Sequence, residues 1–256
     1  MRARGFDESS IAAAIARSPL APAPRPASVP RLPADPIPPA RLDLPRAVAL
    51  GGDKAELYVA DGFLTPEACD EMTRLIVAQL RPSTTTIPPG TTYDATFRTS
   101  RTCDLDDSMP AASAVEAKIC AAIGFDKSLA EKTQGQHYEI GQVFKLHTDF
   151  FKPNELDTYG TLRHGQRTWT FMVYLHEPQG GGETEFPDLG FKIEPKLGRA
   201  VLWNNLYDSG EGNYSTQHQS LPVTAGTKTI ITKWFRVPKV PKPTSGTSFT
   251  GWKLPV

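Results

Sequence analysis

Residues 169–175 read WTFMVYL, and this stretch decides the fold class. Every second residue from Trp169 to Leu175 is apolar and bulky, which is the period of two that a β-strand imposes on its faces. Further short apolar stretches follow, separated by turns rich in Gly, Pro and Asn: FKIEP (191–195), GRAVLWNN (198–205) and TKTIITKWFRV (227–237). Short strands at this spacing predict an all-β sandwich or barrel in the C-terminal half, rather than a parallel α/β sheet.

Before these strands the sequence predicts one more strand, AELYVADGFL (55–64), and two helices. In TPEACDEMTRLIVAQL (65–80), Thr65 is a candidate N-cap and Pro66 stands at the first helical position. Its inward face at helical spacing comprises Cys69, Met72, Leu75, Ile76 and Leu80. The second helix runs through SAVEAKICAAIG (113–124) and ends at its final glycine. The expected architecture is a mostly β core with supporting α-helices from the N-terminal half.

Composition divides the chain into three parts. Residues 1–48 hold ten of the 24 prolines, and we expect a disordered Pro/Ala-rich arm, because such a segment cannot bury enough apolar surface to fold. The folded domain is expected over residues 49–238, followed by a Pro-rich tail over residues 239–256. Within the domain, the Thr-, Pro- and Gly-rich stretch 81–96 is long enough to form a lid over a binding site.

The charge balance argues against nucleic acid and membrane as partners. The 256 residues include 28 basic and 28 acidic side chains, so the formal net charge is zero. A neutral chain is not attracted to polyanions by its overall charge, and no apolar stretch reaches the length of a membrane span. The three cysteines lack metal-ligand spacing. We therefore expect reduced thiols, with Cys69 and Cys120 in the core, and a cytoplasmic protein.

A candidate metal site begins with HTDFF, which starts at His147. On a strand, residues i and i+2 point to the same face, so His147 and Asp149 direct an imidazole and a carboxylate into one cavity. His137 and Glu139 form a second pair of this type ten residues upstream, so the pattern alone does not identify the ligands. His218 is the candidate for a third ligand from a neighbouring strand. It would complete the two-histidine, one-carboxylate face that leaves positions open at Fe(II).

Five motifs occur in a fixed order: HYEIGQVFKLHTDFF (137–151), GQRTWTFMVYL (165–175), GGGETEFP (180–187), GRAVLWNN (198–205) and HQSLPVTAGTKTIITKWFR (218–236). In this order they resemble the prolyl 4-hydroxylase family of Fe(II)/2-oxoglutarate-dependent dioxygenases. The family fold is a double-stranded β-helix, a cupin-like jelly roll with helices on one side, which agrees with the strand pattern above.

The resemblance selects one of the two pairs as iron ligands. It makes His147, Asp149 and His218 the ligands. The family pattern has a tyrosine nine residues before the metal histidine, and Tyr138 stands at that distance from His147. His137 and Glu139, which flank this tyrosine, are therefore not expected to bind metal.

The resemblance also implies residues for the cosubstrate and the substrate. The ammonium of Lys228 is expected to pair with the distal carboxylate of 2-oxoglutarate, since a buried ammonium needs an anionic partner. Three further residues are expected to bind the same cosubstrate: Tyr138, Thr184 and Trp234. Arg167 is expected to face the substrate as a catalytic residue, and Lys233 is expected to face solvent.

The implied activity is hydroxylation of an unactivated C–H bond, first of a peptide or protein proline, with release of succinate and CO2. The implied cofactors are Fe(II), 2-oxoglutarate, O2 and ascorbate. Two alternatives stay open: the same chemistry on a free amino acid or other small molecule, and a catalytically silent jelly-roll binding module. Phe144 favours the first, because peptide-hydroxylating relatives often have tyrosine three residues before the metal histidine. The full ligand set argues against the second.

Overall fold

The structure of the chain, a computed structural model, describes residues 15–17, 41–84, 94–106, 108–152, 155 and 165–237. The predicted C-terminal tail lies outside these ranges, as do residues 85–93 of the predicted lid. Within the described ranges, no helix has the length and apolar character needed to cross a membrane.

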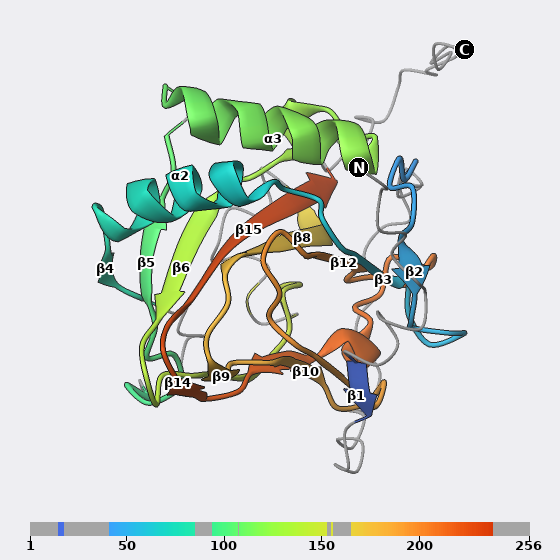
Figure 1. Cartoon of the computed structure of the whole chain (residues 1–256). Helices are drawn as coiled ribbons and strands as arrows, with labels where there is room; N and C mark the ends of the chain where they lie inside the picture. Colours follow the sequence, from blue (N-terminus) through green and yellow to red (C-terminus); the bar gives the residue numbers. More distant parts are fainter. Residues whose placement is uncertain are drawn as a thin grey trace, which may run out of the picture.

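Two antiparallel β-sheets carry the fold (Figure 1). The larger sheet has the strand order β2 (Val48–Ala49), β3 (Leu57–Ala60), β12 (Ala200–Asn204), β8 (Gln166–His176), β15 (Lys228–Val237), β6 (Gln134–Tyr138), β5 (Arg101–Asp104) and β4 (Arg81–Pro82). The smaller sheet has the order β1 (Ile15–Arg17), β11 (Phe191–Ile193), β10 (Thr184–Phe186), β13 (His218–Ser220) and β7 (Phe144–His147). Strands β9 (Gly180–Gly181) and β14 (Val223–Ala225) pair separately. The predicted double-stranded β-helix is confirmed.

Two helices, α2 (Pro66–Val77) and α3 (Pro110–Ile123), cover the outer face of the larger sheet (Figure 1). Helix α2 starts as predicted, with the Thr65 hydroxyl accepting from the amide of Ala68 at 3.3 Å. Helix α3 begins three residues earlier than predicted and ends at Gly124, whose φ of +74° favours glycine. Two short 3-10 turns, η1 (Lys127–Leu129) and η2 (Tyr214–Thr216), complete the described helical segments.

Strand β8 separates two apolar clusters. Its residues Trp169, Phe171, Val173 and Leu175 pack with the helices on the outer side. The alternate residues Met172 and Tyr174 belong to a second cluster, which fills the space between the two sheets. Both faces of this strand are therefore buried. Its alternating residues belong to two different apolar clusters, and neither face is exposed to solvent.

The folded region extends into the predicted arm. The amides of Arg41 and Asp43 donate to the carbonyls of Ile123 at 3.1 Å and Ala122 at 2.8 Å. Nearby leucines of this segment pack against the outer apolar cluster. Further upstream, β1 pairs antiparallel with β11 at the edge of the smaller sheet. The described residues just before position 49 thus pack on the C-terminus of α3.

The prediction that Lys233 faces solvent is wrong. Lys233 is 1% exposed and forms an ion pair with the buried Glu116 of α3. It stands five positions after Lys228 on β15, and an odd offset places two side chains on opposite faces of a strand. The predicted core position of Cys69 agrees with its full burial, whereas Cys120 is only partly buried against the outer cluster.

Candidate active site

A cavity lies on the inner face of the larger sheet. It encloses about 390 Å³ of space when its open mouth is included, which suits a small organic ligand. It is lined by Gln136, Tyr138, Phe144, His147, Asp149, Met172, Thr184, Trp203, His218, Ser220, Lys228, Ile230, Thr232 and Trp234. Of the eight residues predicted to act in the site, seven are in this lining; Arg167 packs behind it.

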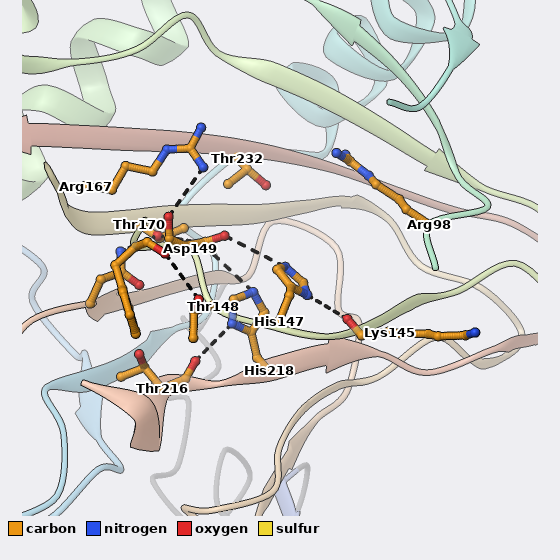
Figure 2. A network of polar contacts seen from close by, with 12 residues as sticks. Arg98, Lys145, His147, Thr148, Asp149, Arg167, Thr170, Thr216, His218 and Thr232 are labelled. Carbon is orange, nitrogen blue, oxygen red and sulfur yellow. Dashed lines mark hydrogen bonds and ion pairs between the residues drawn. The ribbon is translucent and has the colours of Figure 1, made fainter. Parts of the chain in front are cut away.

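The three predicted metal ligands meet at one end of the cavity (Figure 2). His147 ends β7 and His218 begins β13, and the two residues are directly paired in the ladder between these strands. Asp149 follows two residues after His147. Its carboxylate oxygens lie 3.8 Å from Nε2 of His147 and 4.0 Å from Nε2 of His218. One ligand atom from each residue lies within 4.8 Å of the other two.

The protonation of this triad suits metal binding. Nδ1 of His147 lies 2.8 Å from the carbonyl of Lys145, and Nδ1 of His218 lies 3.0 Å from that of Thr216. Each carbonyl accepts the Nδ1 proton, which leaves Nε2 as the free lone pair. Burial, together with the like charge of His218, lowers the pKa of His147 to about 3. At neutral pH this imidazole is therefore uncharged and able to ligate a metal.

Asp149 is held by a polar chain that the sequence did not reveal. Burial raises its pKa, but the two histidines, Arg167 and a hydrogen bond from Thr170 outweigh burial and lower it. The Thr170 hydroxyl donates to Oδ2 of Asp149 at 2.7 Å and accepts from Nδ2 of Asn205 at 2.9 Å. This chain keeps the carboxylate ionised and fixes its orientation.

These residues fit iron as a resident metal. Two imidazole nitrogens and one carboxylate in one cavity lining form the ligand set of non-haem Fe(II) oxygenases, which leaves further coordination positions open. In the described ranges, His147, Asp149 and His218 are the only cluster of potential ligands of this kind.

Lys228 enters the cavity from β15 and is fully buried. Its ammonium donates to the carbonyl of Gly182 at 2.7 Å and to the Ser220 hydroxyl, and it lies 4.3 Å above the ring of Tyr138, its partner across the strand ladder. Gly182 has a φ of +78°, a conformation that favours glycine. Burial lowers the pKa of Lys228 to about 7 although the charge of Glu183 opposes this, and no carboxylate of the described residues forms an ion pair with Lys228. A buried ammonium of this kind is stabilised when an anionic ligand binds beside it.

The other predicted cosubstrate residues also line the cavity. The Tyr138 hydroxyl donates to Gln136 at 2.7 Å, and the hydroxyls of Thr184 and Tyr174 share a hydrogen bond of 2.6 Å. The indole N–H of Trp234 is buried and has no acceptor in the described part of the chain. An unpaired buried donor costs stability, so a ligand acceptor at this position would satisfy it.

Arg167 lies beside Trp234, with its guanidinium 4.1 Å above the indole ring. It forms a two-point ion pair with Glu131, at 2.6 Å and 2.8 Å, and Glu131 also accepts from Arg236 at 2.7 Å. A third nitrogen of Arg167, Nη1, lies 3.5 Å from the carbonyl of Asp149 (Figure 2). Arg167 is therefore adjacent to the metal ligands and fixed in place by Glu131.

Sequence reasoning missed several residues of the site that the strand period could have found. Trp203 is two residues beyond Val201 and shares its inward face; its indole packs 4.7 Å from the His218 ring and its N–H has no acceptor in the described ranges. Ser220 follows His218 by two residues and therefore shares its face of β13. Thr170 lies between the outward-facing Trp169 and Phe171, so its side chain points to the inner face of β8. His137, in contrast, hydrogen-bonds Thr229 and is outside the cavity lining, as predicted.

Sequence comparison identifies relatives with the same site region. A model of the 2OG-Fe(II) oxygenase superfamily matches residues 133–236, which include all three candidate ligands. The chain is 33% identical over 184 residues to prolyl 4-hydroxylase subunit alpha-1 of Gallus gallus, covering 71% of this chain and 36% of that protein. It is 30% identical over 197 residues to prolyl 4-hydroxylase 13 of Arabidopsis thaliana, covering 70% of each. The chain thus spans little more than a third of the animal relative.

Structure comparison agrees with the sequence matches. The fold is similar to a viral collagen prolyl hydroxylase of Paramecium bursaria Chlorella virus-1, solved as its 2OG complex. The TM-score is 0.57 with 26% sequence identity, and the match covers 75% of this chain and 100% of that one. The similarity therefore extends over the whole viral fold.

Proposed function

The chain belongs to the prolyl 4-hydroxylase family of 2OG-Fe(II) oxygenases, and from this premise we propose that it hydroxylates a proline residue of a peptide or protein. Bound Fe(II) and 2-oxoglutarate supply the oxidising chemistry, in which O2 is consumed and succinate and CO2 are released. Ascorbate, as a reductant for the iron, is part of the proposal.

One observation carries the proposal: a complete metal triad and an unpaired lysine occupy the same cavity. His147, Asp149 and His218 lie at one end, and Lys228 faces the same space from β15. A binding module without catalysis has no need of two imidazole nitrogens directed at one ionised carboxylate. The arrangement supports an active enzyme over the silent jelly roll.

Each set of residues has a defined task. The triad binds the metal through two Nε2 atoms and one carboxylate oxygen, with Thr170 and two backbone carbonyls fixing the ligands. Lys228 binds the distal carboxylate of 2-oxoglutarate, and the hydroxyls of Tyr138 and Thr184 supply further polar contacts in the same pocket. Trp234 and the aromatic residues around it exclude water from the reacting atoms.

A second candidate function is the same chemistry on a free amino acid or other small molecule. Phe144 favours it, because this ring stacks on His147 with centroids 3.6 Å apart and offers no hydroxyl to a peptide. Three free cysteines support the further proposal of a reducing, cytoplasmic environment.

The test is succinate formation by anaerobically iron-loaded protein after addition of 2-oxoglutarate and O2, with and without proline-rich peptides. We expect peptide-stimulated succinate and hydroxyproline, and none with His147→Ala. His137→Ala, a histidine outside the cavity, is the matched control and keeps the activity. Succinate that only a small molecule stimulates would support the second candidate. Iron-loaded protein that makes no succinate under any condition contradicts both.

A further inference from the structure

Arg98 is a partly buried arginine near the metal site, and its side chain hydrogen-bonds to neutral groups. It precedes β5 and bridges to Phe144 of β7. Its guanidinium donates to the Gln134 side chain at 2.7 Å and to the Ser100 hydroxyl at 3.4 Å. It lies 4.6 Å above the Phe144 ring, whose other neighbour is His147. Within the described ranges no carboxylate forms an ion pair with it.

Arg167 approaches the same space from the other side. It covers Trp234, a cavity-lining ring, as Arg98 covers Phe144. Figure 2 shows the two guanidinium groups pointing toward each other from opposite sides, with Thr232 between them. Their charges interact: burial lowers the pKa of Arg98, Tyr138 and Asp149 partly oppose this, and the positive charges of Arg167 and Arg81 lower the pKa further. Two like charges thus pack against rings that line one cavity.

The nearby carboxylates are already in use. Glu131 is shared between Arg167 and Arg236, so this group of three carries one net positive charge. Asp149 is committed to the metal site and to Thr170. Glu155 acts on Arg167 at longer range, and its carboxylate accepts from the amide of Lys152 at 2.7 Å. With Arg98 included, three guanidinium groups and the one carboxylate of Glu131 leave two positive charges without a counter-charge in this group.

Resting on the proposed function, we propose that the space between Arg98 and Arg167, beside the cavity, binds a carboxylate group of the substrate. The enzyme therefore selects a target residue that carries a carboxylate or stands next to one. The source is either an Asp or Glu side chain beside the target residue, or the α-carboxylate of a C-terminal or free amino acid.

The chemistry favours a carboxylate over a neutral group at this place. Guanidinium groups hold carboxylates with charge-assisted hydrogen bonds that are about twice as strong as neutral ones. Burying two like charges together is unfavourable unless an anion joins them. Lys228 lines the cavity and is the proposed cation for 2-oxoglutarate, so Arg98 and Arg167 are not needed for the cosubstrate and can bind the substrate.

The experiment compares blocked peptides of one length that differ only beside a central proline, with Asp, Asn or Lys in that position. Two further arms separate the sources: a peptide ending in proline with a free or an amidated C-terminus, and free L-proline. We expect kcat/KM for at least one carboxylate-bearing substrate to exceed that of its neutral counterpart by about tenfold, as one charge-assisted hydrogen bond predicts. The Lys peptide is expected to be the poorest substrate.

Arg98→Gln assigns the preference to this position. It is expected to reduce the ratio between acidic and neutral substrates to near one, while Arg98→Lys retains part of it. Arg101→Gln is the matched control, because Arg101 is exposed and donates only to the carbonyl of Leu80 at 3.2 Å, and it keeps the full ratio. A ratio near one in the wild type, or equal losses for acidic and neutral substrates in Arg98→Gln, overturns the inference.

A binding measurement separates this inference from the proposed function. Anisotropy of labelled Asp and Asn peptides is recorded anaerobically with Fe(II) and 2-oxoglutarate present, so no turnover is needed. Tighter binding of the Asp peptide, lost in Arg98→Gln, supports the carboxylate site even if no peptide is hydroxylated. Equal binding together with normal turnover contradicts the carboxylate site alone. Absence of succinate with every substrate contradicts the proposed function alone.

Discussion

Lys228 and Lys233 are two buried lysines on one strand, and they differ in what surrounds their charge. Lys233 points outward under α3, where Glu116 neutralises it, and Lys127 of η1 lies 2.6 Å from the same carboxylate. Lys228 points inward and meets a carbonyl, a hydroxyl and an aromatic ring. The fold thus compensates one ammonium internally and leaves the other for a ligand.

The difference extends to the two faces of β8 and β15. The outer residues, such as Phe171 and Phe235, pack against helices and serve stability. The inner residues Thr170, Thr232 and Trp234 lie near the metal site or line the cavity. Substitutions on the outer face should therefore change the free energy of unfolding, and those on the inner face should change ligand binding.

The largest effect is expected for Lys228→Met. It removes the cation that we propose binds the distal carboxylate of 2-oxoglutarate, and we expect the affinity for this cosubstrate to fall by about a hundredfold or more. The melting temperature should stay equal or rise, because a buried ammonium without a counter-charge is removed. Anaerobic titration of the iron-loaded protein and thermal unfolding measure both. A large loss of stability with unchanged affinity would contradict the assigned role.

Lys233→Met should have the opposite profile. It leaves Glu116 buried with only Lys127 as partner, and we expect a loss of about 2 kcal/mol in the free energy of unfolding. The affinity for 2-oxoglutarate should not change. The double variant Glu116→Leu/Lys233→Met should recover most of the stability. A double-mutant cycle based on the free energies of unfolding in urea measures this. If the double variant is as unstable as the single one, the ion pair is not the cause.

Thr170→Val tests the inner face of β8. It removes the hydroxyl that orients Asp149 at nearly constant volume, and we expect metal affinity to fall about tenfold. The matched control is Thr168→Val on the same strand, whose hydroxyl donates to the carbonyl of Phe235 at 3.2 Å. Equilibrium titration with Fe(II) or Co(II) measures the difference. Equal affinities in the two variants would show that the hydrogen bond to Asp149 is dispensable.

The smallest effect is a pH dependence of cosubstrate binding. Below pH 7 Lys228 is charged in the free site; above it the amine is neutral and binding must take up a proton. Affinity for 2-oxoglutarate should therefore fall by up to about tenfold between pH 7 and pH 8, and Lys228→Met should lack this trend. A wild-type affinity that stays flat over this range would contradict the lowered pKa.

The same shift affects folding with the opposite sign. The folded-state pKa of Lys228 is below the unfolded value of 10.5, so the unfolded chain binds more protons between about pH 7 and that value. The contribution of Lys228 to stability therefore improves as pH rises through this window.

Much of the fold was predictable because strand and helix periods are local properties. The period of two in β8 and the N-cap at Thr65 could be identified without knowledge of the tertiary structure. The positions of His147, Asp149 and His218 followed from the i, i+2 rule together with the order of the family motifs. The structure places these three residues together, while the roles of the cosubstrate residues remain predictions.

The rest depends on which elements pack together, and no local pattern encodes that. Lys233 was expected to face solvent. Its partner, Glu116, lies 117 residues away on α3, so the local sequence contains no sign of the ion pair. Arg98 was not singled out, since only the pairing of residues near β5 with β7 places it above Phe144. Such long-range partners decide whether a charged side chain is compensated.

The pairing of His147 with His218 across β7 and β13 has a consequence for the resistance of the protein to proteolysis. A metal ion held by both residues would act as a removable cross-link that closes the loop of 70 residues between them. Because such an ion binds only the folded site, its binding energy is added to the free energy of unfolding of the smaller sheet. Chelation should therefore open this sheet to proteolysis, and iron supply would set the lifetime of the chain as well as its activity.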